Sequence, residues 1–420
     1  MPEGVADDDA NYALDIVEAI CRDVGPGLPG SPQEGERSAF IKKELEKHLG
    51  VGNVVTEEFS LAPGAFLGSL RISALLLLGA AVLNITTEPV TGMSAFLTTT
   101  IALAFSSVAV LVFLIEFLLS YELIDPVFPK KQSENVIGAL RRPGTKDVKR
   151  LLIMSGHHDS AWENNWLRLP GYGFFVASAT PIIGLAVMLG MCIIQLSGVV
   201  TGNTGIIALG TLGWILTAYP ITPSIVLPML YNLGGKGGGS VPGAADNLAA
   251  SALTVAMSRF LVDNPEYIPA DTEIRFVSFG SEEAGLRGSR RYVESHRNEL
   301  KRLDARLLNM EIIAYPEIGI LTTEVNGTVK NSPELVKSIV AAAERAGVPY
   351  KVKSAYLGVA GDAGPFSRAG IKAVTLLCFK VPEQMLAFYH QRTDTPEVLT
   401  LKPLSNVLKL ASEWIRSGGE

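Results

Sequence analysis

One stretch of this chain constrains its fold more than any other: residues 169–235 contain no Asp, Glu, Lys or Arg. Candidate metal-binding segments flank this stretch, with Gly156-His157-His158-Asp159-Ser160 before it and Gly243-Ala244-Ala245-Asp246-Asn247 after it. Because about 20 apolar residues suffice to cross a bilayer, an uncharged run of this length is typical of two spanning helices. The sequence therefore predicts a membrane hairpin inserted between two parts of a candidate metal site.

Four membrane-spanning segments are predicted, arranged as two hairpins: 66–86, 94–115, 174–200 and 206–230. Arg71 and Glu116 lie near the ends of the first pair. Only 19% of all residues are charged, compared with about 25% in soluble proteins. The alternative, a set of buried core helices in a large soluble domain, is disfavoured by the length of the charge-free run.

The distribution of Lys and Arg predicts the orientation of these segments. The short connections 87–93 and 201–205 contain no Lys or Arg, whereas the opposite ends carry several, including Arg168 and Lys236. Positively charged loops are retained on the cytoplasmic side of a membrane. The protein is therefore predicted to be a multi-pass integral membrane protein whose residues outside the two hairpins lie in the cytoplasm. Because the N-terminus is acidic, no cleavable signal peptide is predicted, and three scattered cysteines are not expected to form a disulfide framework.

Removing hairpin 1 (66–119) and hairpin 2 (169–235) leaves a discontinuous domain formed by 1–65, 120–168 and 236–420. Its pattern alternates between strands and helices. Strands are predicted at 53–61, 134–140, 150–154, 273–280, 306–313, 319–324 and 373–378, and helices at 10–21, 34–48, 246–262, 288–296, 332–346 and 405–416. This alternation predicts an α/β fold with a mostly parallel central sheet covered by helices on both faces. Active sites in such folds lie at the carboxyl ends of the strands.

Two of the candidate site segments directly follow apolar strands. His157 and Asp159 are two residues apart at a strand end, so their side chains point the same way, and Asp159 is suited to bind the second imidazole nitrogen of His157. Glu282 and Glu283 are adjacent, so one can bind a metal while the other acts as general base.

Three further candidates complete the set: Asp246 in a turn that opens a helix, Glu311 after a strand, and His390 near Asp394. A short carboxylate such as Asp246 could bridge two cations. Taken singly, each motif has a structural reading, because His-x-Asp pairs and adjacent glutamates are common without metals, and His158 is expected to face away. The ordered set, with each member at a strand or loop edge, favours a metal site.

This ordered set resembles the zinc metallopeptidase family of the bacterial di-zinc aminopeptidases and glutamate carboxypeptidase II. The resemblance covers nearly all of the chain outside the hairpins. The matching segments are Gly156–Ser160, Gly243–Ser251, Phe279–Ser289, Asn309–Glu311, Gly361–Phe366, Gly370-Ile371, Tyr389-His390 and Asp394-Thr395, with Gly30-Ser31-Pro32 and Asn135-Val136-Ile137.

The resemblance implies two Zn²⁺ ions, one bound by His157 and Glu311 and the other by Glu283 and His390. Asp246 would bridge them, and a cis peptide would follow it. Glu282 would be the general base for a metal-activated water, Asp159 would orient His157, and Tyr389 is a candidate for oxyanion stabilisation. The implied activity is peptide hydrolysis by an exopeptidase of the aminopeptidase type.

The chain departs from the family pattern at two places. Glu311 stands where the family usually has Asp, and Gly361 stands where relatives often have Ser. Zinc accepts either carboxylate, but the extra methylene of Glu311 leaves the occupancy of that metal position and the identity of its metal open.

Other functions remain as alternatives. A glutaminyl-cyclase-like enzyme of the same fold would keep a single zinc, and a catalytically silent membrane adaptor would have lost ligands. A transporter is disfavoured because the spans contain almost no ionisable residues. The expected partners are peptide substrates, hydrophobic ones in particular, and membrane lipid, whereas the net charge of −6 argues against nucleic acid. Small residues in the apolar helices would permit a homodimer. Arg287, Arg290 and Arg291, at a helix start, are expected to be solvated.

Overall fold

The computed structural model describes residues 7–87, 93–169, 173–203 and 239–420, together with Gly205, Gly213, Ile215 and Leu216. Contacts divide the chain into two units. Unit 1 comprises Met1–Pro63, Lys130–Glu163 and Gly235–Glu420, and unit 2 comprises Gly64–Pro129 and Asn164–Gly234. The sequence-based division had placed the corresponding boundaries after residues 65, 119, 168 and 235, so the two divisions differ most at the second one.

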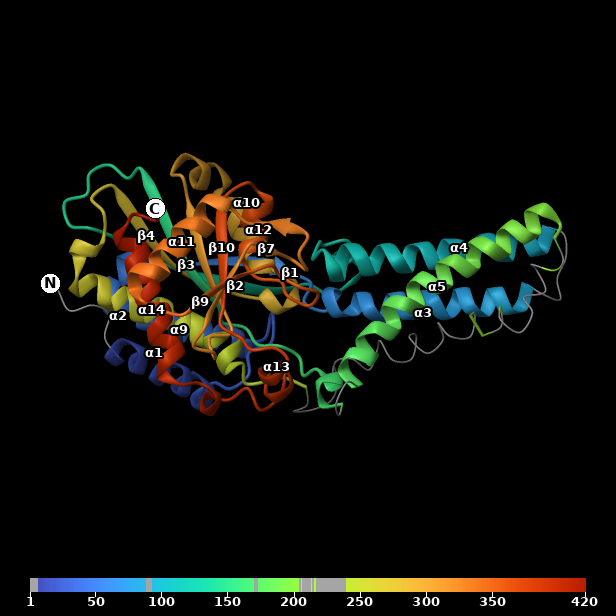
Figure 1. Cartoon of the computed structure of the whole chain (residues 1–420), viewed down its shortest axis with the longest axis horizontal. Helices are drawn as coiled ribbons and strands as arrows, with labels where there is room; N and C mark the ends of the chain where they lie inside the picture. The colour runs from blue at the N-terminus through green and yellow to red at the C-terminus, as the bar shows by residue number, and fades with distance from the viewer. Residues whose placement is uncertain are drawn as a thin grey trace. The chain divides into compact units, whose positions relative to one another are not determined.

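Unit 1 is built on an eight-stranded sheet in the order β1-β2-β4-β3-β5-β10-β6-β9 (Figure 1). β4, β3, β5 and β10 run parallel to one another, and antiparallel pairs flank them at β1-β2, β2-β4 and β10-β6. The predicted α/β class with a mostly parallel sheet is confirmed. The strands are β1 (Val54–Leu61), β2 (Lys131–Arg141), β3 (Arg150–His157), β4 (Thr272–Phe279), β5 (Arg306–Glu311), β6 (Ile318–Leu321), β9 (Tyr350–Lys353) and β10 (Lys372–Leu377).

Helices cover both faces of this sheet. On one face, α10 and α12 share an apolar core with alternate residues of β3 and β4, such as Ile153 and Val277. On the other face, α9 packs on β3 and β4 and is itself covered by α1, α2 and α14. The helices are α1 (Asp7–Asp23), α2 (Pro32–Leu49), α9 (Ala249–Asp263), α10 (Arg287–Arg302), α11 (Pro333–Ala346), α12 (Ala363–Arg368), α13 (Glu383–Ala387) and α14 (Leu401–Arg416).

Local signals set several of these boundaries. The Ser31 side chain caps α2 by accepting the Glu34 N–H, and Pro32 occupies the first turn, where no amide donor is needed. Gly156 in β3 allows the close approach of α9, because a Cβ there would lie 2.4 Å from the Cβ of Ala250. The strand that ends at His157 is therefore held directly against the helix that follows Asp246.

Two predicted elements were wrong in detail, and two short strands were missed. The predicted strand 319–324 is two strands, because the chain leaves the main sheet after Leu321 and pairs again as β7 (Thr323–Glu324) with β8 (Val329–Lys330). The predicted helix 246–262 begins regularly only at Ala249, since Asp246 and Asn247 have non-helical backbone angles. The strands β8 and β9 are only two and four residues long, and they were not predicted.

The described part of unit 2 is helical. It contains α3 (Ala65–Thr87), α4 (Met93–Val112), which continues through a π-helical turn (Phe113–Leu118), and α5 (Gly173–Thr201). Three helices, Ala65–Thr87, Ser94–Leu118 and Gly173–Thr201, are long and apolar enough to cross a membrane. The predicted apolar segments 66–86, 94–115 and 174–200 are thereby confirmed as helices, while 206–230 falls almost entirely outside the described residues.

Candidate metal centre

The candidate ligands come together at the carboxyl ends of three neighbouring parallel strands. His157 is the last residue of β3 and Glu311 the last residue of β5. Glu282 and Glu283 form a 3-10 turn shortly after β4. The sheet topology thus brings together residues that are far apart in the sequence, because the carboxyl ends of neighbouring parallel strands lie at the same edge of the sheet.

The Asp246 carboxylate lies between the imidazoles of His157 and His390. Its Oδ1 is 3.4 Å from Nε2 of His157, and its Oδ2 is 3.1 Å from Nε2 of His390. Nε2 of His157 also lies 3.6 Å from Oε2 of Glu311, and Nε2 of His390 lies 3.1 Å from Oε1 of Glu283. Each oxygen of one carboxylate therefore faces a separate His-carboxylate pair.

These donors fit metal ions. His157, Asp246 and Glu311 form one group whose ligand atoms all lie within 4.8 Å of one another, and Asp246, Glu283 and His390 form a second. Imidazole nitrogens and carboxylate oxygens are the ligands that zinc accepts. Clustered carboxylates removed from water need compensating positive charge, so the site's composition suits cations.

The pKa shifts of the clustered carboxyl groups also indicate a site that suits cations. Burial raises the pKa of Glu311 well above its usual range, and the carboxylates of Asp362 and Asp246 raise it further, against the opposing effect of His157. Burial also raises the pKa of Glu282 well above its usual range; Glu283 and Glu311 add to the shift, and His157 opposes it. Crowded carboxyls of this kind are stabilised in their charged form by a nearby metal ion.

Asp159 performs two tasks in this site. Its Oδ1 lies 3.2 Å from Nδ1 of His157, the contact expected of a residue that orients the imidazole. Its carboxylate also accepts the backbone N–H groups of Glu282, at 3.0 Å, and Glu283, at 2.9 Å. The second task could not be read from the sequence, and it couples the β3 end to the turn that carries both glutamates.

A second buried carboxylate holds this turn from the other side. Glu34, in the first turn of α2, accepts the Ser281 hydroxyl on Oε1 at 2.7 Å and the Gly30 N–H on Oε2 at 2.6 Å. Ser281 has a left-handed backbone with φ 54°, directly before Glu282. The only sequence signal for this link was the capping pattern Ser31-x-x-Glu34, which predicts a helix start rather than a contact with the site.

Asp394 fixes the turn that presents Asp246. Its carboxylate accepts the backbone N–H groups of Ala245, at 2.8 Å, and Asp246, at 3.1 Å. The peptide between Asp246 and Asn247 is cis, as the resemblance implied. The loop that carries His390 therefore also positions the shared carboxylate.

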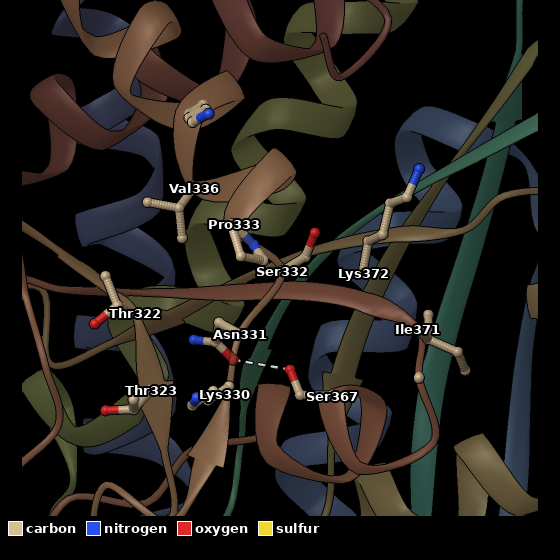
Figure 2. A pocket seen from close by; sticks show the side chains of 12 residues that line it. Thr322, Thr323, Lys330, Asn331, Ser332, Pro333, Val336, Ser367, Ile371 and Lys372 are labelled. Atoms are coloured by element: carbon tan, nitrogen blue, oxygen red, sulfur yellow. Dashed lines mark hydrogen bonds between the residues drawn. The ribbon is translucent and has the colours of Figure 1, made fainter.

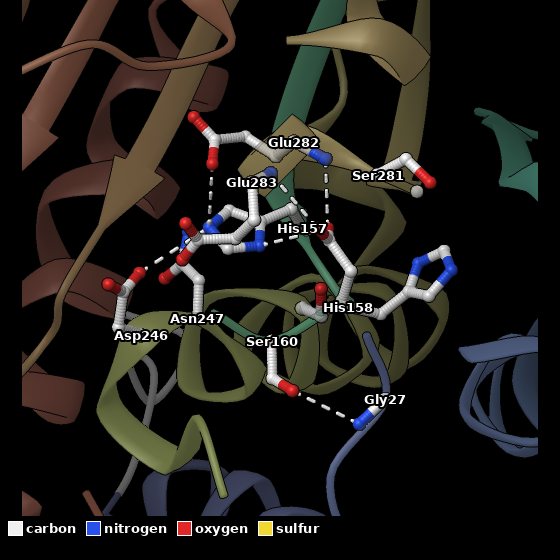
Figure 3. A network of polar contacts seen from close by, with 12 residues as sticks. Gly27, His157, His158, Ser160, Asp246, Asn247, Ser281, Glu282 and Glu283 are labelled. Atoms are coloured by element: carbon white, nitrogen blue, oxygen red, sulfur yellow. Dashed lines mark hydrogen bonds and ion pairs between the residues drawn. The ribbon is translucent and has the colours of Figure 1, made fainter. Parts of the chain in front are cut away.

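Tyr389 and His158 lie beside the cluster. The Tyr389 ring stacks on the His390 ring, with centroids 3.9 Å apart, so this contact supports the imidazole, while the oxyanion role remains a prediction. His158 points away from the cluster (Figure 3), and its Nδ1 lies 3.0 Å from the Ser278 hydroxyl. The expectation that Arg287 is solvated was wrong: its side chain is buried, and its Nε donates to the Ala284 carbonyl at 2.9 Å.

A separate pocket of about 710 Å³ lies in unit 1 away from these residues (Figure 2). It is lined by the start of α11, the β6–β7 junction and the first residue of β10, Lys372. Ser367 donates to Asn331 across its floor at 2.8 Å. Because Glu311 pairs with the far end of β10, at Leu377, this pocket is at the opposite edge of the sheet from the candidate metal ligands.

Comparisons with known proteins agree with this geometry. Residues 231–415 match the model described as Peptidase family M28. The aminopeptidase YwaD of Bacillus subtilis is 31% identical over 165 residues, which are 39% of this chain and 35% of that protein. This part of the chain, residues 231–415, which carries Asp246, Glu282, Glu283, Glu311 and His390, is similar to M28 peptidases. The match spans only about a third of the length of YwaD.

Solved structures of known enzymes share the fold of this chain. A zinc aminopeptidase from Bacillus subtilis is 15% identical with a TM-score of 0.54, covering 97% of this chain and 94% of that one. A glutaminyl cyclase from an Acidobacteriales bacterium is also 15% identical with a TM-score of 0.54, covering 99% and 97%. At these identities the likeness shows the fold alone, and it does not distinguish between the two activities.

Proposed function

We propose that this protein is a membrane-anchored, zinc-dependent exopeptidase of the aminopeptidase type. The observation that carries the proposal is the position of Asp246, whose two carboxylate oxygens face His157 and His390. His157 with Glu311 and His390 with Glu283 would hold one ion each, with Asp246 shared between them. Zinc bound in this way supplies Lewis acidity, which polarises a peptide carbonyl and activates water for attack.

Glu282 is the general base in this proposal. It is anchored by its backbone N–H to Asp159, and its Oε2 reaches to 3.7 Å from Nε2 of His157, inside the ligand cluster. A carboxylate at this position can accept a proton from the attacking water on Oε2 and deliver it to the leaving amine. Its neighbour Glu283 faces His390 instead, so the two adjacent glutamates have separate tasks.

The decisive test is the Glu282→Gln variant. Hydrolysis of aminoacyl fluorogenic substrates is expected to fall about 10²–10⁴-fold, because proton transfer is lost while the amide keeps the size of the side chain. Metal content, measured by elemental analysis, is expected to stay at the wild-type level. Full turnover in this variant would overturn the assignment of the base.

Two observations bear on the alternatives. A single-zinc cyclase needs only one ligand set, whereas both the His157 and the His390 sets are assembled here. A silent adaptor would have no need for competent side chains at every ligand position. Assaying peptides with an N-terminal Gln alongside other aminoacyl substrates, together with the zinc stoichiometry, separates the exopeptidase from both alternatives.

Membrane anchoring rests on the three apolar helices α3, α4 and α5 and on the absence of Lys and Arg from the connection 87–93. We place unit 1 in the cytoplasm, following the Lys and Arg asymmetry. Cysteine labelling in intact cells tests this placement. Labelling of a cysteine introduced near residue 300 by a membrane-impermeant reagent would contradict it.

Hydrophobic or membrane-derived peptides are the substrates that we propose. Within unit 1, the two chain ends that lead to and from residues 164–234 are joined, since Glu163 N–H donates to the Gly239 carbonyl at 2.5 Å and Trp162 bridges to Ser240. The buried Glu163 also pairs with Arg392 at 3.1 Å, two residues beyond His390. The chain ends from which the apolar insertion leaves unit 1 are thus linked to the loop that carries His390. Equal activity on soluble and hydrophobic peptides, independent of lipid, would count against this proposal. Homodimer formation remains a prediction.

A further inference from the structure

Glu311 is held unusually firmly for a candidate metal ligand. Its Oε1 accepts the Asn309 side-chain amide at 2.9 Å, and its Oε2 accepts the Asn247 side-chain amide at 2.7 Å. Both amides are themselves tied: Asn247 also donates to the Met310 carbonyl, and Asn309 accepts the Ser155 hydroxyl. The Glu311 carboxylate therefore cannot move without breaking hydrogen bonds inside the protein.

Gly361 lies directly against this carboxylate. A Cβ added at position 361 would be 3.2 Å from Oε1 of Glu311, 3.4 Å from Cγ of Glu311 and 3.3 Å from Nδ2 of Asn309. These separations are tighter than ordinary van der Waals contacts, and the atoms concerned are buried and hydrogen-bonded, so they cannot give way cheaply.

The backbone does not explain why position 361 is glycine. Gly361 is not among the glycines with positive φ, so an L side chain would be compatible with its backbone conformation. What excludes a side chain is the space taken by Glu311 and by the Asn309 amide that donates to it. The Glu311 side chain is one methylene longer than that of aspartate. Shortening residue 311 by one bond of about 1.5 Å would draw its carboxylate back from position 361.

We propose that Gly361 and Glu311 form a matched pair that defines the metal position of His157: the missing side chain at 361 admits the longer carboxylate. A side chain at 361 would push Glu311 out of reach of the ion bound by His157. The position formed by His390 and Glu283 would be unaffected, because neither residue is among the nearest neighbours of a Cβ at position 361. This inference rests on the proposed function in so far as a metal ion binds there.

The test is a double-variant cycle on the full chain: wild type, Gly361→Ala, Glu311→Asp, and both together. Zinc is titrated into metal-free protein against a competing chelator, so that the affinity of each of the two positions is measured. With Glu311 present, Gly361→Ala is expected to weaken one position about 10-fold or more, as displaced ligand support does, and to leave the other unchanged. In the Glu311→Asp background, the same substitution is expected to cost about three-fold or less, because the coupling is lost.

Gly35→Ala is the matched control. Gly35 lies exposed in α2, with nothing within 4 Å of an added Cβ, so both zinc affinities should remain at the wild-type level. An equal loss in the wild-type and Glu311→Asp backgrounds, or no loss in either, would overturn the pairing. If Gly361→Ala prevents folding, recovery of folding in the double variant supports the pairing, and failure of both contradicts it.

Failure of the proposed function would look different. In that case no variant, wild type included, would bind zinc at either position. The same four proteins would still reveal the steric pairing in their metal-free unfolding free energies, which are expected to be coupled for residues in contact.

Discussion

The two units of this protein bury polar groups in different ways. Unit 1 concentrates carboxylates and imidazoles at one sheet edge, where Asp246 alone faces two histidines. The described helices of unit 2 instead bury neutral groups, among them two that donate to backbone carbonyls: Ser73 donates to the Ala109 carbonyl at 3.0 Å, and Gln195 donates to the Asn84 carbonyl at 2.9 Å. One hydrogen bond offsets the cost of burying a neutral group, whereas a cluster of charges needs a cation.

Unit 2 also buries a charged residue, Glu116, and its surroundings follow the same rule. Glu116 is fully buried at the end of the α4 helix, where its carboxylate accepts the backbone N–H groups of Leu123 and Ile124 at 2.6 and 3.0 Å. A single carboxylate can be satisfied by backbone donors. The candidate metal centre contains too many carboxylates for that solution, so its stability should depend on metal and on pH to an extent that unit 2 does not share.

The largest expected effect is at Asp246. Burial alone would raise the pKa of this carboxyl, but His157 and His390 outweigh it and hold the pKa below its usual range. Asp246→Asn is expected to abolish hydrolysis and to remove zinc from both positions, since it takes away the charge that the two histidines share. Elemental analysis measures this directly. Retention of two zinc ions would show that Asp246 does not bridge them.

The next effect is at Asp159, which supports ligands without being one. Asp159→Asn is expected to weaken zinc binding by about 10–100-fold, the range found for groups that orient metal-bound histidines. The variant also loses charge at the acceptor of the Glu282 and Glu283 amides, so activity at saturating zinc should stay below wild type. Complete rescue by excess zinc would limit its role to metal affinity.

A smaller, pH-dependent effect is expected at Glu34. Burial, with Asp159 adding, raises the pKa of Glu34 to about 8 from its usual 4.5. A raised pKa means that the folded state binds the proton more tightly, so this contribution to stability is complete below about pH 4.5 and is lost as the pH rises towards 8. In metal-free protein the unfolding free energy should therefore fall across this interval, and Glu34→Gln should flatten that part of the fall. An unchanged slope in denaturant titrations would contradict this assignment.

The smallest effect is expected in unit 2. The Asn84 amide lies 3.3 Å from Sγ of Cys192 and 3.6 Å from Sδ of Met188, in the buried face between apolar helices. Asn84→Leu is expected to change stability in detergent by about 0.6 kcal/mol, the average for polar contacts between helices in membranes. Zinc affinity and hydrolysis should be unaffected. A loss of zinc in this variant would show that the contrast between the units is wrong.

Much of the fold was accessible from local patterns. The apolar runs of α3, α4 and α5, and the buried strands β3 and β4, are encoded in consecutive residues, so hydropathy and periodicity located them. Breaks were harder to locate. The separation of β6 from β7 at Thr322 and the non-helical start at Asp246 depend on what each segment packs against, and neither changes the apolar pattern of its own stretch.

In the candidate site, too, some features were predictable from the sequence and others were not. The residue types and their order, from His157 to His390, are properties of the sequence, and the family resemblance that they carry implied two His-carboxylate sets around Asp246. The contacts that position them come from residues far apart in the chain: Glu34 reaches Ser281, Asp394 holds Ala245, and Gly361 leaves room for Glu311. Such contacts arise only when the strand ends of the sheet are brought together, because no local pattern specifies which buried groups will face each other. The sequence by itself determined which side chains are available to bind metal, and the tertiary structure decided the distances and hydrogen bonds between them.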